Sequence, residues 1–220
     1  MVRVEFLRWP SLWLLVALLL ADAGFIQLHR LHLQDGLGDR FSLEHERSYS
    51  EYFQHAKELM AAALAGVLFF RTGERLFAIW AGLFAYLFVD DAFEVHESAG
   101  QVLAGWWPGV SLLGLGIQPV GEALLSAAVG LVFLVGLALA WRRSAPAARQ
   151  FSLVLLALLA ALAVFGVLID TLHVAAAQAP WHYRLGIIED GGEMVVLTMM
   201  LWVLFESVRA TQDSRARIAF

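Results

Sequence analysis

The sequence contains no cysteine and only one lysine, and only 16% of its 220 residues are charged. Without cysteine the chain cannot form a disulfide framework, a thiolate metal site or a thiol nucleophile. Its basic residues form no stripe, which argues against a nucleic-acid partner. An ordinary soluble domain is roughly 25% charged and about 45–50% apolar, whereas this chain is 60% hydrophobic. The composition therefore argues against a soluble globule, a disordered chain or a coiled coil and predicts a membrane protein.

Two long runs, residues 123–141 and 151–169, contain no charged residue. At a rise of about 1.5 Å per residue, either run can cross a hydrocarbon core of about 30 Å. Helices are expected because a segment in lipid must satisfy its own backbone hydrogen bonds. The predicted fold is all-α, a polytopic integral membrane helix bundle that forms a single transmembrane domain over residues 1–220. Its six predicted spans cover about residues 9–28, 52–70, 76–96, 120–141, 151–176 and 185–205.

The N-terminal segment has two interpretations. Arg3 and Arg8 precede an apolar run, and the Ala-Asp-Ala sequence at residues 21–23 resembles a signal-peptidase site. Apolar character continues through residues 24–26. We therefore favour an uncleaved first span.

The distribution of arginine predicts the orientation, because cytoplasmic connections are enriched in Lys and Arg. Basic residues mark the N-terminus, the second and fourth connections and the C-terminal tail, whereas residues 97–118 contain none. Both termini are therefore predicted to be cytoplasmic. In the third connection, the sequence Trp-Trp-Pro-Gly at residues 106–109 suits an interfacial turn, a plain aromatic anchor or a short re-entrant segment.

Three predicted spans have apolar cores that reach the required ~20 residues only if they include a polar turn. These turns are residues 51–58 at the start of the second span, 90–97 at the end of the third and 186–193 at the start of the sixth. The fifth span ends in a fourth polar turn, residues 170–173. Given the predicted orientation, all four turns fall at the extracytoplasmic end. The orientation used only Lys and Arg, so this agreement supports it independently.

Acids and histidines within these turns are spaced to share one helix face, because positions i, i+3, i+4 and i+7 lie together. Each of four helices can therefore direct at least two oxygen or nitrogen ligands toward a common axis. The predicted metal ligands are His55, Glu58, Asp90, Glu94, Glu97, Asp170, His173, Glu189 and Glu193. Supporting positions are Glu51, Lys57, Asp91, His96 and Asp190.

Other polar residues receive plainer interpretations. His96 ranks below His55 because, on a continuous helix, it lies more than a quarter turn from the face of Asp90. Asp22 is predicted to be a supporting or interfacial residue, and Glu122 to mark a helix start. The histidines at positions 29, 32, 45 and 182 are predicted to lie in loops.

Converging carboxylates repel one another, so some must take up protons, pair with cations or bind metal. An ionised acidic side chain within a bilayer costs several kcal/mol of free energy, so such residues are interpreted as functional by default. Only Lys57 and Arg184 are available as local cations. Carboxylates and imidazoles without cysteine suit Fe, Mn or Zn. The sequence therefore predicts a divalent metal centre of one ion or two.

The first of two resemblances is to ferritin-like di-iron proteins. Helix bundles of that kind build di-metal sites from inward-facing Glu residues and Glu-x-x-His pairs. The polar turns here resemble such sites, but they carry Asp170-x-x-His173 and the reversed His55-x-x-Glu58 in place of Glu-x-x-His.

The motifs Asp-Asp and His-Glu within residues 90–97, and Glu-Asp and Glu-Met within residues 189–194, are similar to those of uncharacterised bacterial multi-span membrane proteins. This second resemblance covers the third to sixth spans and implies a bacterial inner membrane protein, without an activity.

Several functions remain open at this point. The first is a membrane metalloenzyme, an oxidoreductase or a hydrolase, whose metal activates oxygen or water against a lipid-like substrate from the outer leaflet. A zinc hydrolase resembling the alkaline-ceramidase-like family is one variant, although that family is richer in His and includes a Ser. The second is a proton- or cation-coupled transporter, against which the cytoplasmic half offers only Ser126 and Thr198 as weak candidates. The third is a non-catalytic subunit with a solvated acidic vestibule.

Overall fold

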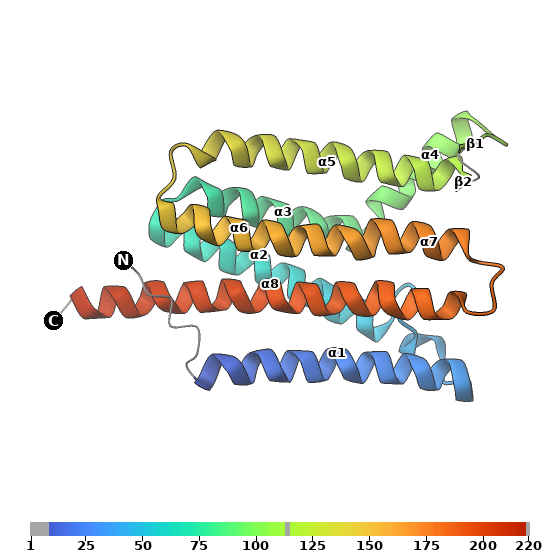
Figure 1. The fold of residues 1–220 in the computed structure, drawn as a ribbon, viewed down its shortest axis with the longest axis horizontal. Helices are drawn as coiled ribbons and strands as arrows, with labels where there is room; N and C mark the ends of the chain where they lie inside the picture. Colours follow the sequence, from blue (N-terminus) through green and yellow to red (C-terminus); the bar gives the residue numbers. More distant parts are fainter. Residues whose placement is uncertain (1–8, 113–114, 219–220) are drawn as a thin grey trace.

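The computed structural model describes residues 9–112 and 115–218 (Figure 1). Arg3 and Arg8, which are predicted to mark the cytoplasmic N-terminus, lie outside these residues. The long helices are α1 (Trp9–Asp35), α2 (Tyr49–Thr72), α3 (Arg75–Ala92), α4 (Val95–Trp106), α5 (Ile117–Trp141), α6 (Pro146–Ala163) and α8 (His182–Ile218). Shorter elements are η1 (Asp39–Phe41), β1 (Ser111–Leu112), β2 (Leu115–Gly116), η2 (Val164–Ile169) and α7 (Asp170–Ala175).

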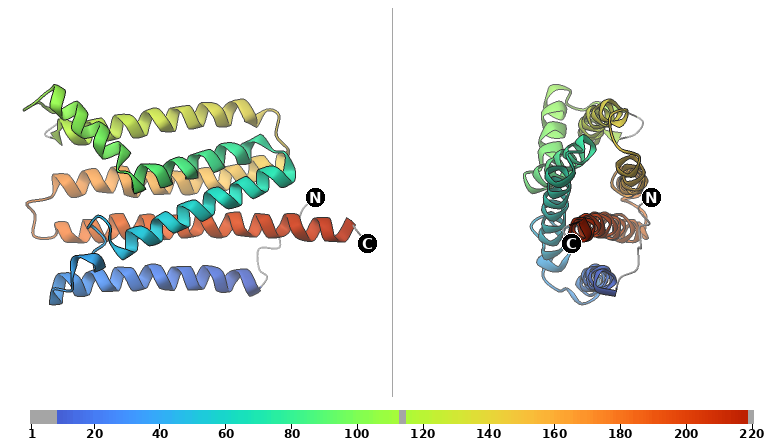
Figure 2. Two further views of the ribbon diagram at one scale, coloured as in Figure 1. Left: turned by 180° about the vertical axis from the view of Figure 1, so that it is seen from behind. Right: turned by 90° about the vertical axis from the view of Figure 1, so that its left-hand side faces the viewer.

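Helix α8 is the central element of the bundle. It packs against α1, α2, α6, η2 and α7, while α3 packs against α2, α5 and α6. Helix α1 lies at one edge next to α8, and α5 lies at the opposite edge (Figures 1 and 2). The core between the helices is apolar, with Trp80, Phe84, Met200 and Leu204 fully buried.

Local sequence signals fix the ends of α2. Ser48 precedes the helix, and its hydroxyl accepts a hydrogen bond from the backbone N–H of Glu51 at 3.3 Å, which satisfies a free donor of the first turn. Gly73 follows the helix with φ 72°, a left-handed conformation that suits glycine. Its N–H donates to the carbonyl of Phe69, and α2 therefore stops before the turn into α3.

Within the part of the chain that the structure describes, four helical segments are long and apolar enough to cross a membrane: Ser11–Asp35, Ile117–Trp141, Pro146–Ala175 and His182–Gln212. The bent pair of α3 and α4 adds a fifth if it counts as one span. The predicted second span, α2, is not among them. The structure thus confirms the all-helical prediction, apart from the short β1–β2 pair, and supports a membrane bundle with four to five candidate spans.

The predicted third span differs from the structure. The helix ends at Ala92, Glu94 adopts a left-handed conformation with φ 53°, and α4 begins at Val95 after a bend of 61°. Such a conformation costs a non-glycine residue roughly 1–2 kcal/mol. The side chain of Asp90 offsets this cost, because its Oδ1 accepts the backbone N–H of His96 at 3.0 Å and caps the new helix.

The described part of the third connection forms α4 and the short antiparallel pair β1–β2. Helix α4 packs closely on α5 where two glycines meet, since a Cβ on Gly121 would stand 2.9 Å from the Cα of Gly100. Gly109 turns the chain with φ 78°, and β1 then pairs antiparallel with β2. Trp106 and Trp107 are exposed, as expected for an aromatic anchor or an interfacial turn.

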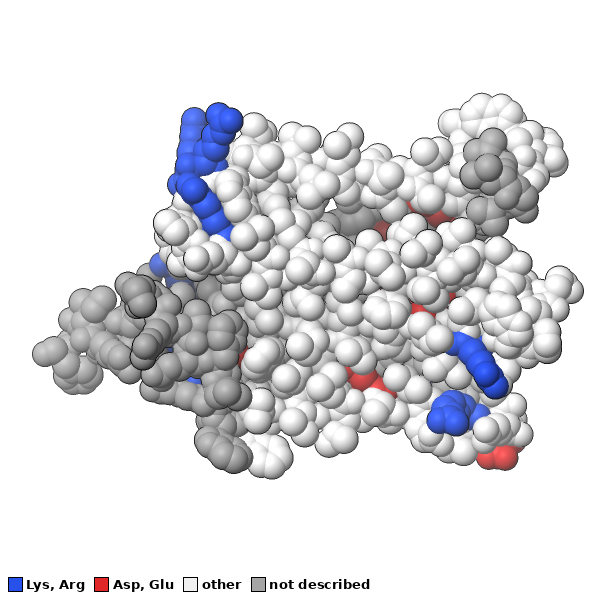
Figure 3. Space-filling view, in the orientation of Figure 1, with Lys and Arg blue, Asp and Glu red and all other residues white. Residues whose placement is uncertain are grey.

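The two ends of the bundle differ in charge. The α2–α3 and α5–α6 connections and the end of α8 lie at one end, and the polar turns of α2, α3, α7 and α8 lie toward the other (Figure 1). On the face drawn in Figure 3, Lys and Arg gather over the α5–α6 connection, while the opposite half shows acidic patches together with further Lys or Arg side chains. The acidic turns therefore gather toward one end of the bundle, whereas basic residues occur at both ends.

Candidate metal centre

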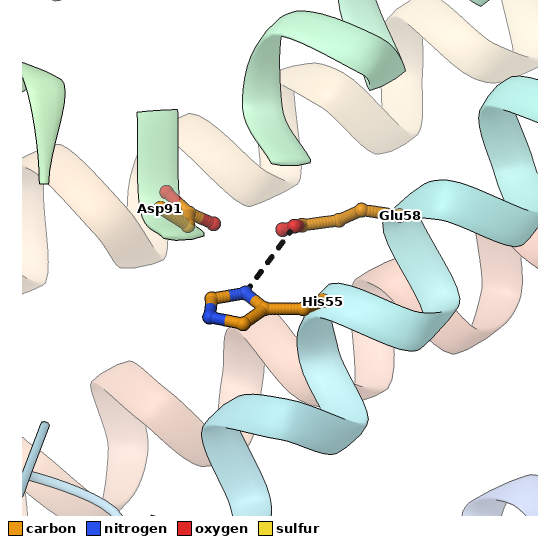
Figure 4. A group of neighbouring side chains, drawn as sticks. All are labelled: His55, Glu58 and Asp91. Carbon is orange, nitrogen blue, oxygen red and sulfur yellow. Dashed lines mark ion pairs between the residues drawn. The ribbon is translucent and has the colours of Figure 1, made fainter. Parts of the chain in front are cut away.

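Three side chains from two helices form a group at the acidic end, here called the inner cluster: His55, Glu58 and Asp91. One ligand atom from each lies within 4.8 Å of the others. In Figure 4, His55 and Glu58 extend from α2 toward Asp91 near the end of α3. Glu58 is only 3% exposed and His55 only 9%. The group is therefore enclosed by protein on most sides.

Two atoms of the inner cluster are free to accept a ligand. The Nδ1 of His55 lies 3.7 Å from the Oε2 of Glu58, and neither atom has a hydrogen-bond partner among the described residues. The other ring nitrogen of His55, Nε2, faces the Oε1 of Glu51 at 3.4 Å. Metal-ligating histidines commonly donate their second N–H to a carboxylate in this way. The Nδ1 lone pair is thus left to face the cluster.

A pocket of about 190 Å³ opens beside the inner cluster. It brings together α2, the junction of α3 and α4, and the start of α8. Its lining residues are Leu43, Ser50, Glu51, Gln54, His55, Asp91, His96, Glu97, Asp190, Glu193 and Met194. The pocket can hold an ion together with water, since one water fills about 30 Å³ of liquid.

Glu193 and Gln54 line the pocket beside the inner cluster. The carboxylate of Glu193 interacts electrostatically with Glu58 and Asp91. Gln54 contributes a buried Oε1 without a hydrogen-bond partner among the described residues. Gln54 was not among the predicted ligands, although its i, i+4 spacing to Glu58 places it on the same helix face.

Asp90 and His96 form a pair of their own. The Oδ2 of Asp90 lies 3.2 Å from the Nδ1 of His96, and its Oδ1 accepts the backbone N–H of that residue. Both oxygens of Asp90 are therefore engaged, although Asp90, Asp91 and His96 also place ligand atoms within 4.8 Å of one another. The low rank given to His96 assumed a continuous helix, and the bend at Glu94 turns its ring back toward Asp90.

The predicted face of Asp90, Glu94 and Glu97 does not exist, because α3 ends before Glu94. Glu94 does not line the pocket. It joins Glu46 and Glu97 in a more exposed group whose ligand atoms lie within 4.8 Å. Glu97 also lines the pocket. The broken helix therefore moves Glu94 away from Glu58 and Glu193.

The remaining predicted ligands form a second group, here called the outer cluster: Glu44, Asp170, His173 and Glu189. The Nδ1 of His173 is hydrogen-bonded to the Oε2 of Glu189 at 2.8 Å. Glu189 interacts electrostatically with Asp170 and Glu44. Asp190 interacts with members of this group and also lines the pocket. The single predicted constellation is thus two neighbouring clusters, and Glu44 was not predicted to belong to either.

Lys57 makes its direct contacts with Asp22 and not with the clusters, although its charge also interacts with Glu58. Its Nζ lies 3.0 Å from the Oδ1 of Asp22 and donates to the carbonyl of Met194 and the hydroxyl of Thr198. Thr198 in turn donates to the Oδ2 of Asp22 at 2.7 Å. Lys57, Asp22 and Thr198 are all 0% exposed. Asp22 is therefore a buried partner that ties α1 to α2 and α8, while the other local cation, Arg184, is exposed.

Gly166, in the π-helical segment η2, makes room for Glu193. A Cβ at this position would clash with the Oε1 of Glu193. Segments of π-helix occur frequently at functional sites. The sequence offered no signal for this role, because neither the π-helix nor the approach of α8 to η2 follows from hydropathy.

We expect Gly166→Ala to displace the Glu193 carboxylate and to weaken metal binding about 10–100-fold, the usual cost of disturbing groups that orient a ligand. The measurement is metal affinity of the purified protein. Gly66→Ala is the control, because a Cβ there meets nothing within 4 Å. Equal affinity in both variants would show that Glu193 is not a ligand.

The fold and the clusters define a class of protein: a helical bundle with four to five candidate membrane spans and a pocket of carboxylates and histidines at one end. The chain belongs to the protein family described as Domain of unknown function (DUF8692), which matches residues 11–208. No curated protein and no solved structure matches the chain. The matched residues include both clusters and nearly the whole bundle, so the candidate site lies within the conserved domain that the family model describes.

Proposed function

We propose that the protein is an integral membrane metalloprotein that holds a divalent ion, Fe, Mn or Zn, at the inner cluster. His55, Glu58, Asp91 and Glu193 are its proposed ligands. The observation that carries the proposal is the buried Oε2 of Glu58, which has no hydrogen-bond partner among the described residues and lies 3.7 Å from the Nδ1 of His55, next to a second acid, Asp91. A buried carboxylate needs a partner, and Lys57 is occupied by Asp22. A bound cation supplies the missing charge.

The donor set fits such an ion. It offers one imidazole nitrogen and three carboxylates without sulfur, which suits borderline and hard metals. The ion would supply Lewis-acid activation of water or oxygen. The chain itself supplies the orientation of His55 through Glu51, and a pocket wall that combines acids with the apolar side chains of Leu43 and Met194.

A membrane enzyme, an oxidoreductase or a hydrolase, is the function we favour for this centre. The pocket lies at the end of the bundle, at the depth where lipid head groups meet the acyl chains if the candidate spans cross a bilayer. The exposed Trp106 and Trp107 support this placement, because Trp is enriched at that interface. A lipid-like substrate entering from the outer leaflet fits a pocket of mixed polarity.

A proton- or cation-coupled transporter is the second candidate. The buried Asp22, Lys57 and Thr198 favour it, because they continue the polar set from the pocket into the bundle. Residues 199–205 of α8, beyond Thr198, carry no ionisable side chain. A conduction path would need such groups, and this supports the enzyme over the transporter.

Elemental analysis tests the proposal. Protein purified without chelator should carry stoichiometric Fe, Mn or Zn. Glu58→Gln keeps the shape of the side chain but removes an anionic ligand, so it should lose one ion per chain. Glu206→Gln is the matched control, since Glu206 is also a buried glutamate but lies in the distant part of α8. Wild-type protein without any of these metals would favour the transporter or a solvated vestibule.

The proposal includes an orientation: six spans, both termini in the cytoplasm of a bacterial inner membrane, and the clusters on the extracytoplasmic side. Arginine-rich connections at one end of the bundle support it. Reporter fusions at Arg143 and after α8 should read cytoplasmic, and a fusion at Gly105 should read extracytoplasmic. A cytoplasmic signal at Gly105 would contradict the orientation.

A further inference from the structure

A fully buried histidine points toward the outer cluster. The side chain of His29 is 0% exposed, and its Nε2 has no hydrogen-bond partner among the described residues. This nitrogen lies 3.9 Å from the Oε1 of Glu44. His29 was predicted to lie in a loop, but it lies in α1 and is packed beneath the turn that carries Glu44.

The backbone fixes which nitrogen of His29 carries the proton. Its Nδ1 accepts the backbone N–H of Leu43 at 3.0 Å. In neutral imidazole the other nitrogen is then the donor. The Nε2–H therefore lies 3.9 Å from the Oε1 of Glu44, just beyond hydrogen-bond distance, and a small shift of the Glu44 side chain would let it orient that carboxylate for a ligand. Carboxylates that bind metals are commonly held by such a donor.

His173 offers a lone pair close to Glu44, since both side chains lie next to Gly186. Its Nδ1 is held by Glu189 at 2.8 Å. When Nδ1 carries the proton and donates this hydrogen bond to Glu189, Nε2 keeps a lone pair that is free for a ligand. This repeats the carboxylate–histidine arrangement of Glu51 and His55 in the inner cluster.

Gly186 allows Glu44 and His173 to approach each other. A Cβ on this residue would clash with the Oε1 of Glu44 and stand 3.0 Å from the Cε1 of His173. The side chains of Glu44 and His173 therefore both pack against the backbone of α8 at Gly186. The Glu44 side chain is 37% exposed, so a ligand can reach this point from solvent.

We propose that the outer cluster is a second, separate divalent-cation site, with Glu44 and the Nε2 of His173 as ligands, Glu189 orienting His173 and His29 orienting Glu44. Asp170 and Asp190 are further acidic residues next to it. One imidazole with surrounding carboxylates suits an ion of the Zn, Mn or Fe class. The site does not depend on the inner cluster, because the two clusters share none of these ligands.

Zinc counting tests the proposal. Full-length protein is stripped with chelator and dialysed against Zn²⁺, and bound zinc is measured per chain. Wild type should bind two ions, and Glu44→Gln and Gly186→Ala should each bind one. Gly186→Ala is informative because a helical Gly→Ala change favours the helix, and the flexible end of Glu44 can swing aside. His29→Ala should weaken the second ion about 10–100-fold.

The controls separate this site from the inner cluster. Gly66→Ala should keep both ions, and Glu58→Gln should lose the ion that Glu44→Gln keeps. A single zinc that is lost in Glu58→Gln and kept in both Glu44→Gln and Gly186→Ala would overturn the second site alone. A single zinc with the reverse pattern would support the second site and overturn the inner-cluster proposal. If Glu44→Gln and Gly186→Ala each retain two ions, the proposed second site at the outer cluster is overturned.

Discussion

Chelation is expected to lower the melting temperature of the purified protein, and to lower it more at pH 8 than at pH 5. An ion that binds only the folded chain at 100 times its dissociation constant stabilises it by about 2.7 kcal/mol. For a chain of this size, where each kcal/mol shifts the midpoint by about 2–4 °C, that is a loss of about 5–10 °C. Thermal unfolding in detergent with and without chelator measures it.

The pH dependence follows from competition between protons and metal. When the ion is removed, the crowded carboxylates of the inner cluster repel one another unless they take up protons, and proton uptake is less favourable at pH 8 than at pH 5. At pH 5 protons weaken metal binding and partly replace the ion, so chelation removes less stability. Glu58→Gln should show a smaller chelator effect than wild type at pH 8. A melting temperature indifferent to chelator at both pH values would contradict the metal centre.

Lys57→Met should destabilise the protein by about 3–5 kcal/mol, the cost of leaving one member of a buried ion pair without its partner. Asp22 would then be a carboxylate inside the bundle with only the Thr198 hydroxyl as a donor. The melting temperature should fall by more than in any of the ligand variants, and α1 should become the helix most easily released. Thermal unfolding and protease sensitivity of α1 are the measurements.

The double variant Asp22→Asn with Lys57→Met separates charge from packing. Replacing both members of a buried pair is often close to neutral, so the double variant should recover most of the stability lost by Lys57→Met. A double variant as unstable as the single one would show that Lys57 acts through packing against Phe53, whose ring centroid lies 4.9 Å from its Nζ.

Much of the fold could be predicted because hydropathy and arginine placement are strong signals in a membrane chain. The uncharged run at residues 123–141 lies within α5, and the run at 151–169 lies within α6 and η2. The end of α3 could not be predicted, because its cause is a contact between Asp90 and the next helix. Helical spacing assumes a continuous helix, and a single left-handed residue, Glu94, invalidates it beyond residue 92.

The candidate site could be predicted in part for the same reason. His55 and Glu58 lie on an unbroken stretch of α2, so their spacing correctly placed them side by side. Asp90 was predicted to be a metal ligand and Asp91 only a supporting residue. In the structure Asp91 lines the pocket and Asp90 does not. His29 was predicted to lie in a loop and Glu44 was not predicted to be a ligand, because the roles of both depend on the fold of the connection around Leu43.

The bend between α3 and α4 gives two adjacent aspartates different constraints on substitution. Asp90 is bound to His96 through both of its oxygens, whereas Asp91 faces His55 and Glu58. Among members of this family, position 90 should therefore vary together with position 96, and position 91 should vary together with positions 55 and 58. Neighbours in the chain would then belong to separate covarying groups, and a chain that replaces Asp90 with Asn could keep the helix cap without altering the pocket.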